Sequence, residues 1–298
     1  MSDLNSVVVL GEALLDLFPD GAVLGGAPFN LARNLAALGA APLMVTRVGV
    51  DAAGESIAAE FVRFGMDTGG LQRDPQRATG VVHVRMEGQE HRFEIGADSA
   101  WDALDSAELV RSVEAARPAW ICFGTLAQRD PLSRTAIRAG LACTKAQRFL
   151  DLNLRDGPDN RALAEASLAL ADVVKVNKAE LEALLGWFGT PGHPAPIEGL
   201  VERFDLQTLL ITRGADGWAC FDASERRWLE GRAPAEDVID TVGAGDAFSA
   251  VFLLGRLRQW PLALTLQRAG EFASAMCSFK GAVDPSLRAH AEARTAWA

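Results

Sequence analysis

The chain alternates between short apolar runs and longer segments in which apolar residues recur every three or four positions. The short runs predict strands, and the longer period predicts helices that bury one face. The predicted strands span residues 7–10, 43–48, 120–123, 149–152, 173–176, 208–212 and 218–221. The predicted helices span residues 30–38, 55–64, 106–116, 131–142, 161–169, 178–185, 245–257 and 262–279. This alternation indicates βαβ crossovers and a mainly parallel sheet with helices on both faces.

One region breaks the alternation. Residues 80–95 contain two strand-like runs on either side of Glu87, Gly88 and Gln89, which predicts a β-hairpin. A hairpin that projects from an α/β body can act as a lid that excludes water from a site. The pattern is equally compatible with an antiparallel edge of the main sheet.

Composition and charge exclude several classes of function. Of the 298 residues, 49% are hydrophobic and 23% are charged, which is ordinary for a globular protein with a sizeable core. A formal net charge of −10 lacks the basic footprint of a nucleic-acid or anionic-membrane partner, although backbone amides can still bind an anion. The apolar run at 7–10 is too short for a signal peptide or a membrane span, so we expect a cytoplasmic protein.

The sharpest chemical signal is the segment 240–248, DTVGAGDAF, which leads directly into a predicted helix. Gly243 and Gly245, on either side of Ala244, allow a tight turn whose free N–H groups lie at the helix start, where an anion is favoured. Asp246 then has two interpretations. It is either a carboxylate that stabilises the helix start or a general base beside a bound phosphate.

A second glycine-rich turn, GGAPFN at 25–30, precedes another predicted helix, with Gly26 in the turn and Asn30 near the helix start. By itself it predicts a capped helix entry. Asp16 follows the first predicted strand closely. Because ligands of open α/β sheets bind outside the carboxyl ends of the strands, this carboxylate is well placed to hold a polar ligand.

Three further segments follow predicted strands. NKAE at 177–180 places Asn177 and Glu180 on one face of a helix start, either as a capping box or as an oxygen-rich pair for Mg²⁺. The segments DLNLR at 151–155 and TRGADG at 212–217 are ordinary loops by themselves, and the second predicts a hairpin turn. No P-loop motif and no intact dinucleotide fingerprint occurs in the chain.

In this order the segments resemble the ribokinase/phosphofructokinase-B family of ATP-dependent sugar kinases over essentially the full chain. Both family signatures are present, one at 25–30 and one at 240–246, with the other three segments between them. The resemblance implies a single ribokinase-like kinase domain over residues 1–298. Its fold class is three-layer α/β/α, with a mainly parallel central sheet and a small β lid from about residues 12–25 and 80–96.

The resemblance also assigns roles to matching residues. It implies that Asp246 is the catalytic base and that Gly243, Ala244 and Gly245 form the anion hole for the transferred phosphoryl group. The residues implied in substrate binding are Asp16, Gly26, Asn30, Arg129 and Arg155, although Arg129 is equally consistent with a surface arginine. The residues implied beside the nucleotide are Thr212, Gly214 and Gly217. Asn177 and Glu180 are implied to organise Mg²⁺ through water, and Asp240 to contact a monovalent cation such as K⁺.

The segments 100–102, 123–129 and 151–155 are most similar to bacterial fructokinases. We therefore expect ATP and a small sugar as substrates, with phosphoryl transfer to an alcohol group, most readily of fructose. The alternatives are a 2-keto-3-deoxygluconate, ribose or nucleoside kinase of the same fold, or a non-catalytic sugar-binding regulator. Family members often pair through their lids, so we expect a homodimer. The hairpin residues predicted at its interface are Val82, Val84, Met86, Phe93 and Ile95.

Overall fold

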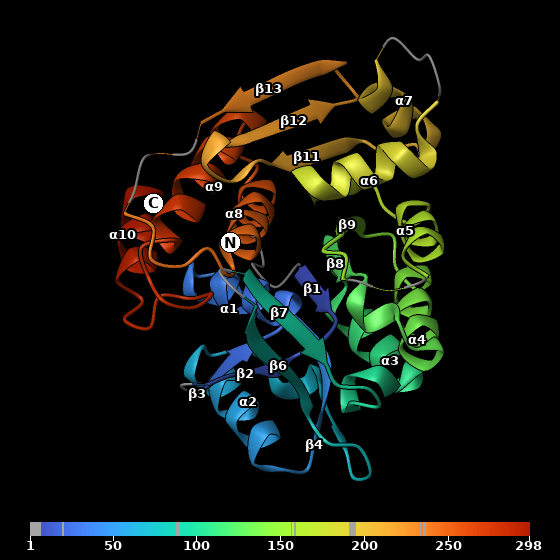
Figure 1. Cartoon of the computed structure of the whole chain (residues 1–298), viewed down its shortest axis with the longest axis vertical. Coiled ribbons are helices and arrows are strands. Elements are labelled where there is room, and N and C mark those ends of the chain that lie inside the picture. Colours follow the sequence, from blue (N-terminus) through green and yellow to red (C-terminus); the bar gives the residue numbers. More distant parts are fainter. Residues whose placement is uncertain are drawn as a thin grey trace.

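The computed structural model describes residues 7–19, 21–87, 90–155, 157, 159–190, 195–232, 234 and 237–298, with the side chains of residues 84–93 outside that description. Its main element is a nine-stranded sheet in the order β13-β12-β11-β10-β9-β8-β1-β4-β5 (Figure 1). The strands are β1 (Val7–Leu10), β4 (Leu43–Gly49), β5 (Leu71–Asp74), β8 (Trp120–Gly124), β9 (Gln147–Asp151), β10 (Val173–Asn177), β11 (Thr208–Thr212), β12 (Trp218–Asp222) and β13 (Arg227–Gly231). All pairs from β11 to β5 are parallel, whereas β12 and β13 form an antiparallel edge.

Helices cover both faces of this sheet, so that it forms the middle of three layers (Figure 1). One face carries α1 (Ala27–Ala37), α2 (Ala52–Arg63), α8 (Ala244–Leu257), α9 (Leu262–Met276) and α10 (Arg288–Ala296). The other carries α3 (Ser106–Ala116), α4 (Pro131–Ala142), α5 (Asn160–Leu168), α6 (Lys178–Phe188) and α7 (Pro196–Arg203). Successive side chains of a strand point to opposite faces of the sheet, and both faces of β1 are apolar. Val7 and Val9 pack into the core under α1 and α8, and Val8 and Leu10 pack into the core under α3 and α4.

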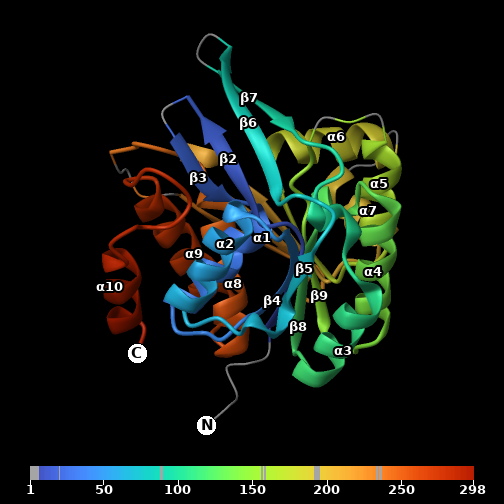
Figure 2. The same cartoon turned by 90° about the horizontal axis from the view of Figure 1, so that it is seen from below.

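A second, four-stranded sheet projects from the body (Figure 2). Its order is β3-β2-β6-β7, with strands β2 (Leu14–Phe18), β3 (Gly21–Gly25), β6 (Gly80–Glu87) and β7 (Glu90–Ile95). β6 and β7 pair antiparallel, which confirms the predicted hairpin. The hairpin joins β2 by a parallel pairing and not the nine-stranded sheet, so the alternative of a main-sheet edge is wrong.

Some elements differ from the sequence prediction. α9 ends at Met276 and not at residue 279, and the carbonyl oxygen of Cys277 accepts hydrogen bonds from the N–H groups of Ile239 (2.8 Å) and Asp240 (3.1 Å). Residues 277–279 follow the helix as turns with bonds to the third preceding carbonyl, and the Cys277 carbonyl bonds the 239–240 loop instead of continuing the helix. The strands β2 and β3 lie within residues 12–25, which the family resemblance placed in the β lid, whereas β5, β13, α7 and α10 were not predicted.

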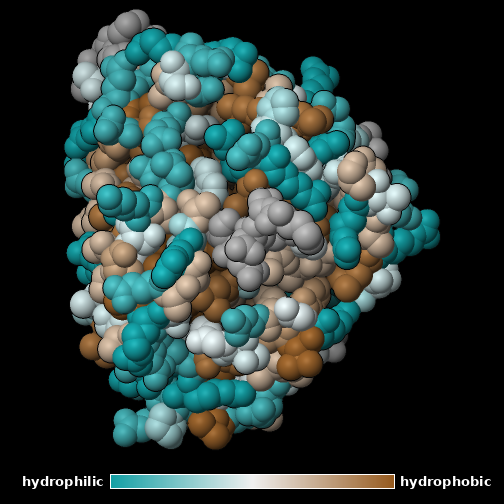
Figure 3. Space-filling view, turned by 180° about the vertical axis from the view of Figure 1, so that it is seen from behind, coloured by the Kyte–Doolittle hydropathy of each residue, from teal (hydrophilic) through white to brown (hydrophobic). Residues whose placement is uncertain are grey.

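The surface shows no concentration of apolar residues on the face in Figure 3, where hydrophobic and hydrophilic residues are interspersed. Among the helices that the structure describes, none has both the length and the hydropathy needed to cross a bilayer.

Candidate active site

A cleft of about 320 Å³ lies between the two sheets, at the carboxyl ends of the parallel strands. β1 sits between β8 and β4, so the strand order reverses there, and such a switch point is where open α/β sheets bind ligands. The small sheet contributes Asp16, Val82 and Ile95 to the lining, and the start of α8 contributes Gly243, Gly245 and Asp246. The two glycine-rich signatures thus meet in one cavity.

The start of α8 presents backbone donors to this cleft. Gly243 is the N-cap with a φ of 78°, and α8 has no side-chain cap. Within the described chain, the N–H groups of Gly245 and Asp246 donate to no protein acceptor, while that of Ala244 makes only a 3.3 Å turn bond to Thr241. Free amides at a helix start form a site for an anion such as a phosphoryl group.

Asp246, in the first turn of α8, is held against α1. The Asn30 side chain donates from Nδ2 to Asp246 Oδ2 at 2.8 Å, across 216 positions of the chain. Burial raises the pKa of Asp246 to about 7, and the Asp151 carboxylate adds to that rise against the opposite effect of Lys175. A carboxyl that titrates near neutral pH is suited to accept a proton from a hydroxyl.

A buried ion pair between two strands of the main sheet packs against the start of α8. Lys175 Nζ lies 3.0 Å from Asp151 Oδ1, and Ser249 Oγ of α8 donates to Asp151 Oδ2 at 2.9 Å. A Cβ at Gly245 would lie only 2.7 Å from Lys175 Nζ, so glycine lets the helix approach this cation. Burial opposes the charge of Lys175, but Asp151 and other carboxylates outweigh it and raise its pKa.

Asp16 and Arg155 line the same cleft from opposite sheets. Burial raises the pKa of Asp16 to about 6, against the lowering effect of Arg155. Gly26, the N-cap of α1, and Asn30 lie beside them in the lining. The cleft therefore gathers carboxylate, amide and guanidinium groups, which is the donor and acceptor set that a polyhydroxylated ligand needs.

Glu12 is a cleft residue that the sequence analysis did not single out. It is 2% exposed, lines the cleft just after β1, and its Oε2 has no hydrogen-bond partner among the described residues. Burial raises its pKa to about 7. Its position directly after the strand 7–10 and Gly11 was the available signal, since strand ends on this edge of the sheet share the site.

Asn177 and Glu180 form a capping box at the start of α6. The N–H of Glu180 donates to Asn177 Oδ1 (2.9 Å) and the N–H of Asn177 to Glu180 Oε2 (2.7 Å), while Leu154 N–H donates to Oε1 (2.9 Å). Within the described residues, no cluster of three or more His, Cys, Asp or Glu side chains could hold a metal ion alone. Among the described residues, each Glu180 carboxylate oxygen accepts one hydrogen bond, which leaves it able to accept another from a metal-bound water.

The predicted nucleotide residues follow β11. Thr212 ends this strand and lines the cleft, whereas Gly214 and Gly217 lie in the turn to β12, with φ values of 57° and 87°. The antiparallel pairing of β11 with β12 confirms the predicted hairpin turn. Of the three residues, only Thr212 is among the described lining residues.

Arg129 lies at the foot of the hairpin and is not among the described lining residues of the cleft. Its Nε and Nη2 donate to the two carboxylate oxygens of Asp102 at 2.8 and 2.7 Å, and its guanidinium lies 4.1 Å above the Trp101 ring. Its Nη2 also donates to the carbonyl of Gly96, just after β7. These contacts tie Arg129 to the foot of the hairpin, and its role in substrate binding stays a prediction.

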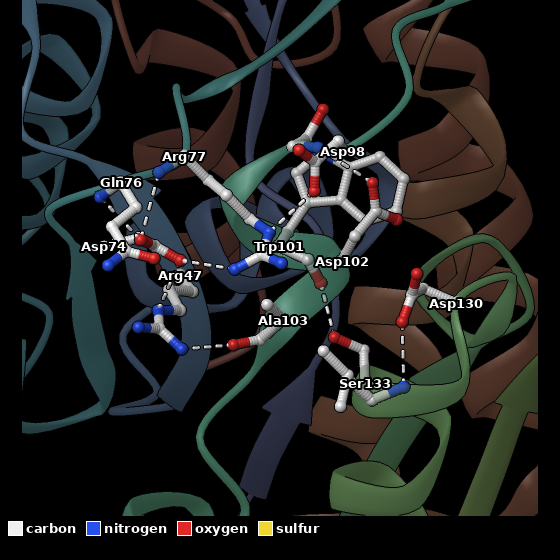
Figure 4. Close-up of polar contacts among 12 residues, drawn as sticks. Arg47, Asp74, Gln76, Arg77, Asp98, Trp101, Asp102, Ala103, Asp130 and Ser133 are labelled. Carbon is white, nitrogen blue, oxygen red and sulfur yellow. Dashed lines mark hydrogen bonds and ion pairs between the residues drawn. The ribbon is translucent and has the colours of Figure 1, made fainter.

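The residues around Asp102 secure the same region (Figure 4). Ser133 Oγ donates to the carbonyl of Trp101 at 2.7 Å. Arg77 forms ion pairs with two carboxylates, Asp98 at 2.7 Å and Asp74 at 3.7 Å. The buried carboxylates of Asp74 and Asp102 thus have arginine partners, which is the usual condition for charges inside a fold, whereas Asp98 is exposed.

Asp240 ties two loops together next to the cleft. Its Oδ1 accepts from the N–H of Val242 (3.0 Å) and its Oδ2 from the N–H of Gly281 (2.9 Å). The carboxylate is thus engaged by backbone amides, and a monovalent cation there stays a prediction.

Two of the hairpin residues predicted at a dimer interface face the cleft. Val82 is 4% exposed and, like Ile95, lines the cavity. The side chains of Val84, Met86 and Phe93 lie outside the described residues. The homodimer therefore stays a prediction that these two residues do not support.

Comparison with known proteins gives the chain its family. Residues 20–289 match the pfkB family of carbohydrate kinases. The chain is 30% identical over 275 residues to the fructokinase of Vibrio alginolyticus, which covers 86% of each chain. It is 28% identical over 284 residues to the aminoimidazole riboside kinase of Salmonella typhimurium, covering 89% of this chain and 85% of that protein.

The fold has close counterparts among solved structures. A fructokinase of Vibrio cholerae O395, in a form with fructose, ADP and calcium ion bound, has a TM-score of 0.80 at 25% identity and covers 99% of both chains. The chain belongs to the pfkB family of carbohydrate kinases and to its fructokinase-like branch. The family and the ribokinase-like fold expected from the sequence are confirmed, and the protein is a phosphotransferase with an alcohol acceptor.

Proposed function

We propose that this pfkB-family kinase transfers the γ-phosphoryl group of ATP to a hydroxyl of a small sugar, with fructose as the leading substrate. The observation that carries the proposal is the start of α8, where Asp246 adjoins the free N–H groups of Gly245 and Asp246 inside the cleft. Preorganised amides can stabilise charge on a transferred phosphoryl group while a carboxylate takes the hydroxyl proton.

The proposed step breaks the O–H bond of the sugar hydroxyl and passes its proton to Asp246. The hydroxyl oxygen forms a bond to the γ-phosphorus as the bond to the β–γ bridging oxygen breaks, and ADP leaves. A pKa of about 7 leaves a large fraction of Asp246 deprotonated at neutral pH and able to act as base.

The remaining cleft residues bind and orient the substrates in this proposal. Asp16, Gly26 and Asn30 hold sugar hydroxyls, and Arg155 offers a cation to the sugar or the phosphates. Thr212, Gly214 and Gly217 border the nucleotide. Asn177 and Glu180 would order the waters of a nucleotide-bound Mg²⁺, which neutralises phosphate charge when it is bound.

The small sheet is proposed to act as a lid, because Val82 and Ile95 line the cleft from it. Apolar side chains that close over the substrates would exclude water and so limit hydrolysis of ATP. The dependence on ATP accords with a cytoplasmic location.

Relatives favour fructose, since the V. alginolyticus relative is a fructokinase, but a second candidate follows from the 28% identical aminoimidazole riboside kinase. A phosphorylation assay with Mg²⁺ and ATP across ketohexoses, pentoses, sugar acids and nucleosides separates them. We expect the highest kcat/KM with fructose. If only nucleosides gave product, a nucleoside kinase would replace the fructokinase proposal. If calorimetry showed sugar binding but no product formed, a non-catalytic sugar-binding regulator would be favoured.

A further inference from the structure

The amide of Asn30 is engaged at both of its polar atoms. Its Nδ2 donates to Asp246 Oδ2 at 2.8 Å, and its Oδ1 accepts from Arg33 Nη2 at 2.6 Å. Asn30 is 5% exposed; one contact comes from Arg33, one turn further along α1, and the other from Asp246 in α8. Two hydrogen bonds through the Asn30 side chain therefore connect Arg33 to Asp246.

Arg33 is itself firmly placed. It is 6% exposed, its Nη1 lies 3.3 Å from Glu60 Oε2 of α2, and its Nη2 donates to the carbonyl of Leu24 in β3 at 3.0 Å. Its guanidinium also lies 4.6 Å from the centre of the Phe29 ring. Arg33 is not among the described residues that line the cleft, so it acts on the site by its charge and through the Asn30 side chain.

The two charged neighbours determine which way the Asn30 amide points. The oxygen and nitrogen of an amide are nearly equal in size, so shape alone does not fix the orientation. A flipped amide would set its N–H donors against the Arg33 guanidinium and its oxygen against the Asp246 carboxylate. Both contacts would be repulsive, and the observed orientation makes both favourable.

We propose that Arg33 is a positioning residue, which fixes the Asn30 amide so that its N–H holds Asp246 ready to accept the substrate proton. The inference rests on the proposed role of Asp246 as base. Because Arg33 also binds Leu24 in β3, one guanidinium links the small sheet, α1 and the base.

Removing Arg33 should raise the pKa of Asp246 for two reasons: a cation is lost, and the freed amide no longer reliably donates to the carboxylate. The other charged groups that act on Asp246 come from the main sheet and the loops after it. They are Asp151, Lys175, Arg155 and Glu12. None of them contacts the Asn30 amide in the described residues, so their effects stay constant in a comparison of Arg33 variants.

The test is a titration of the unliganded protein by NMR of ¹³C-labelled aspartate, with the Asp246 signal identified by its loss in Asp246→Asn. We expect Arg33→Met to raise the pKa of Asp246 by about one unit. The matched control is Arg63→Met, because exposed Arg63 binds the same Glu60 at 3.0 Å but has no link to Asn30. The control should leave the pKa unchanged.

A double-mutant cycle separates the part of the Asp246 pKa shift that passes through the Asn30 amide from the part due to the Arg33 charge alone. In an Asn30→Ala background, the shift caused by Arg33→Met should fall to less than half, since the relay is absent. A shift of equal size in both backgrounds, or none beyond that of Arg63→Met, overturns the proposal. If Arg33→Met does not fold, Arg33→Lys keeps the charge and carries the same cycle, with an upward shift expected and no shift contradicting it.

The titration needs no turnover, so it remains informative if no tested sugar is phosphorylated, an outcome that would instead overturn the proposed function. Where turnover is found, the acid limb of the kcat/KM profile should move to higher pH by the same amount in Arg33→Met and stay in place in Arg63→Met. A purely structural role for Arg33 would lower stability and leave this limb where it is.

Discussion

The helices α6 and α8 both begin at the edge of the cleft, but the N–H groups of their first turns have different partners. At α6, the side chains of Asn177 and Glu180 satisfy the backbone N–H groups reciprocally. At α8, Gly243 offers no side chain, and the amides of Gly245 and Asp246 have no acceptor among the residues that the structure describes. The same element thus gives a closed end in one case and an anion site in the other.

The difference lies in the residue at the N-cap. An asparagine with a glutamate three positions later fills the helix end with the chain's own oxygens, so the end is stable without a ligand. A glycine leaves the helix dipole and its donors for a bound phosphate, and the fold must then support that end by other contacts. Here the support is the buried pair of Lys175 and Asp151.

The largest effect should come from that support. Lys175→Met strands Asp151 as an uncompensated buried charge, and we expect a loss of about 3–5 kcal/mol in unfolding free energy. The control is Lys178→Met, since Lys178 is the exposed first residue of α6, and it should stay within about 0.5 kcal/mol of wild type. Urea denaturation measures both. Equal losses would show that the two helix starts do not differ in this way.

The pH dependence of stability should reveal the buried base of α8. A carboxyl with a folded pKa of about 7 and an unfolded pKa of about 3.9 stabilises the fold below pH 4, and this contribution is lost as the pH rises through 7. Asp246→Asn removes the effect, which is on the order of 4 kcal/mol for about three pKa units at about 1.4 kcal/mol each. The variant should gain stability over wild type between pH 4 and pH 8 in thermal denaturation. A constant difference across that range would contradict the raised pKa.

Gly245→Ala probes the close approach of α8 to Lys175. The added Cβ would lie 2.7 Å from Lys175 Nζ, so either the helix start or the Lys175 ammonium must move. Because the buried ion pair with Asp151 holds that ammonium, we expect the amide donors to shift and turnover to fall by about tenfold or more. Gly186→Ala in α6 is the matched control, because nothing lies within 4 Å of its added Cβ. It should keep its turnover and gain up to about 1 kcal/mol in stability. Steady-state assays would refute the account if both variants turned over alike.

The smallest effect concerns the capped helix. Asn177→Ala removes one acceptor at the start of α6 and should lower the unfolding free energy by about 1 kcal/mol. Its turnover should fall less than that of Gly245→Ala if capping is the main role of Asn177. A larger fall that excess Mg²⁺ restores would instead assign Asn177 chiefly to the metal.

The sequence allowed the sheet, most helices and the two glycine-rich signatures to be predicted, because apolar periodicity and turn residues are local features. The apolar pattern by itself did not mark β2 and β3 as strands, because the pairing of β2 with β6 depends on contacts far along the chain; the family resemblance placed residues 12–25 in the β lid. The capping-box interpretation of Asn177 and Glu180 is confirmed by the hydrogen bonds, while their role toward Mg²⁺ stays a prediction.

The parts of the site that were missed share one property: they are charged residues within or next to apolar segments. Lys175 interrupts the strand run Val173–Asn177, and Glu12 and Arg33 are nearly fully buried. Their partners come from distant elements, as with Arg33 and Glu60 or Lys175 and Asp151. A lone charge in a buried pattern signals a partner, but only the fold shows which one. Arg129 illustrates the same point, since the sequence did not reveal Asp102 as its partner, and its contact with substrate stays a prediction.

The central claim is that Asp246 is the base beside the free amides of α8, and one measurement tests it most directly. The kcat of Asp246→Asn with Mg²⁺, ATP and the preferred sugar is compared with that of wild type, alongside sugar and nucleotide binding by calorimetry. We predict a fall of about 10²–10⁴ in kcat with both affinities largely retained, because the variant keeps the shape of the side chain and loses the base. Turnover close to that of wild type would contradict the claim.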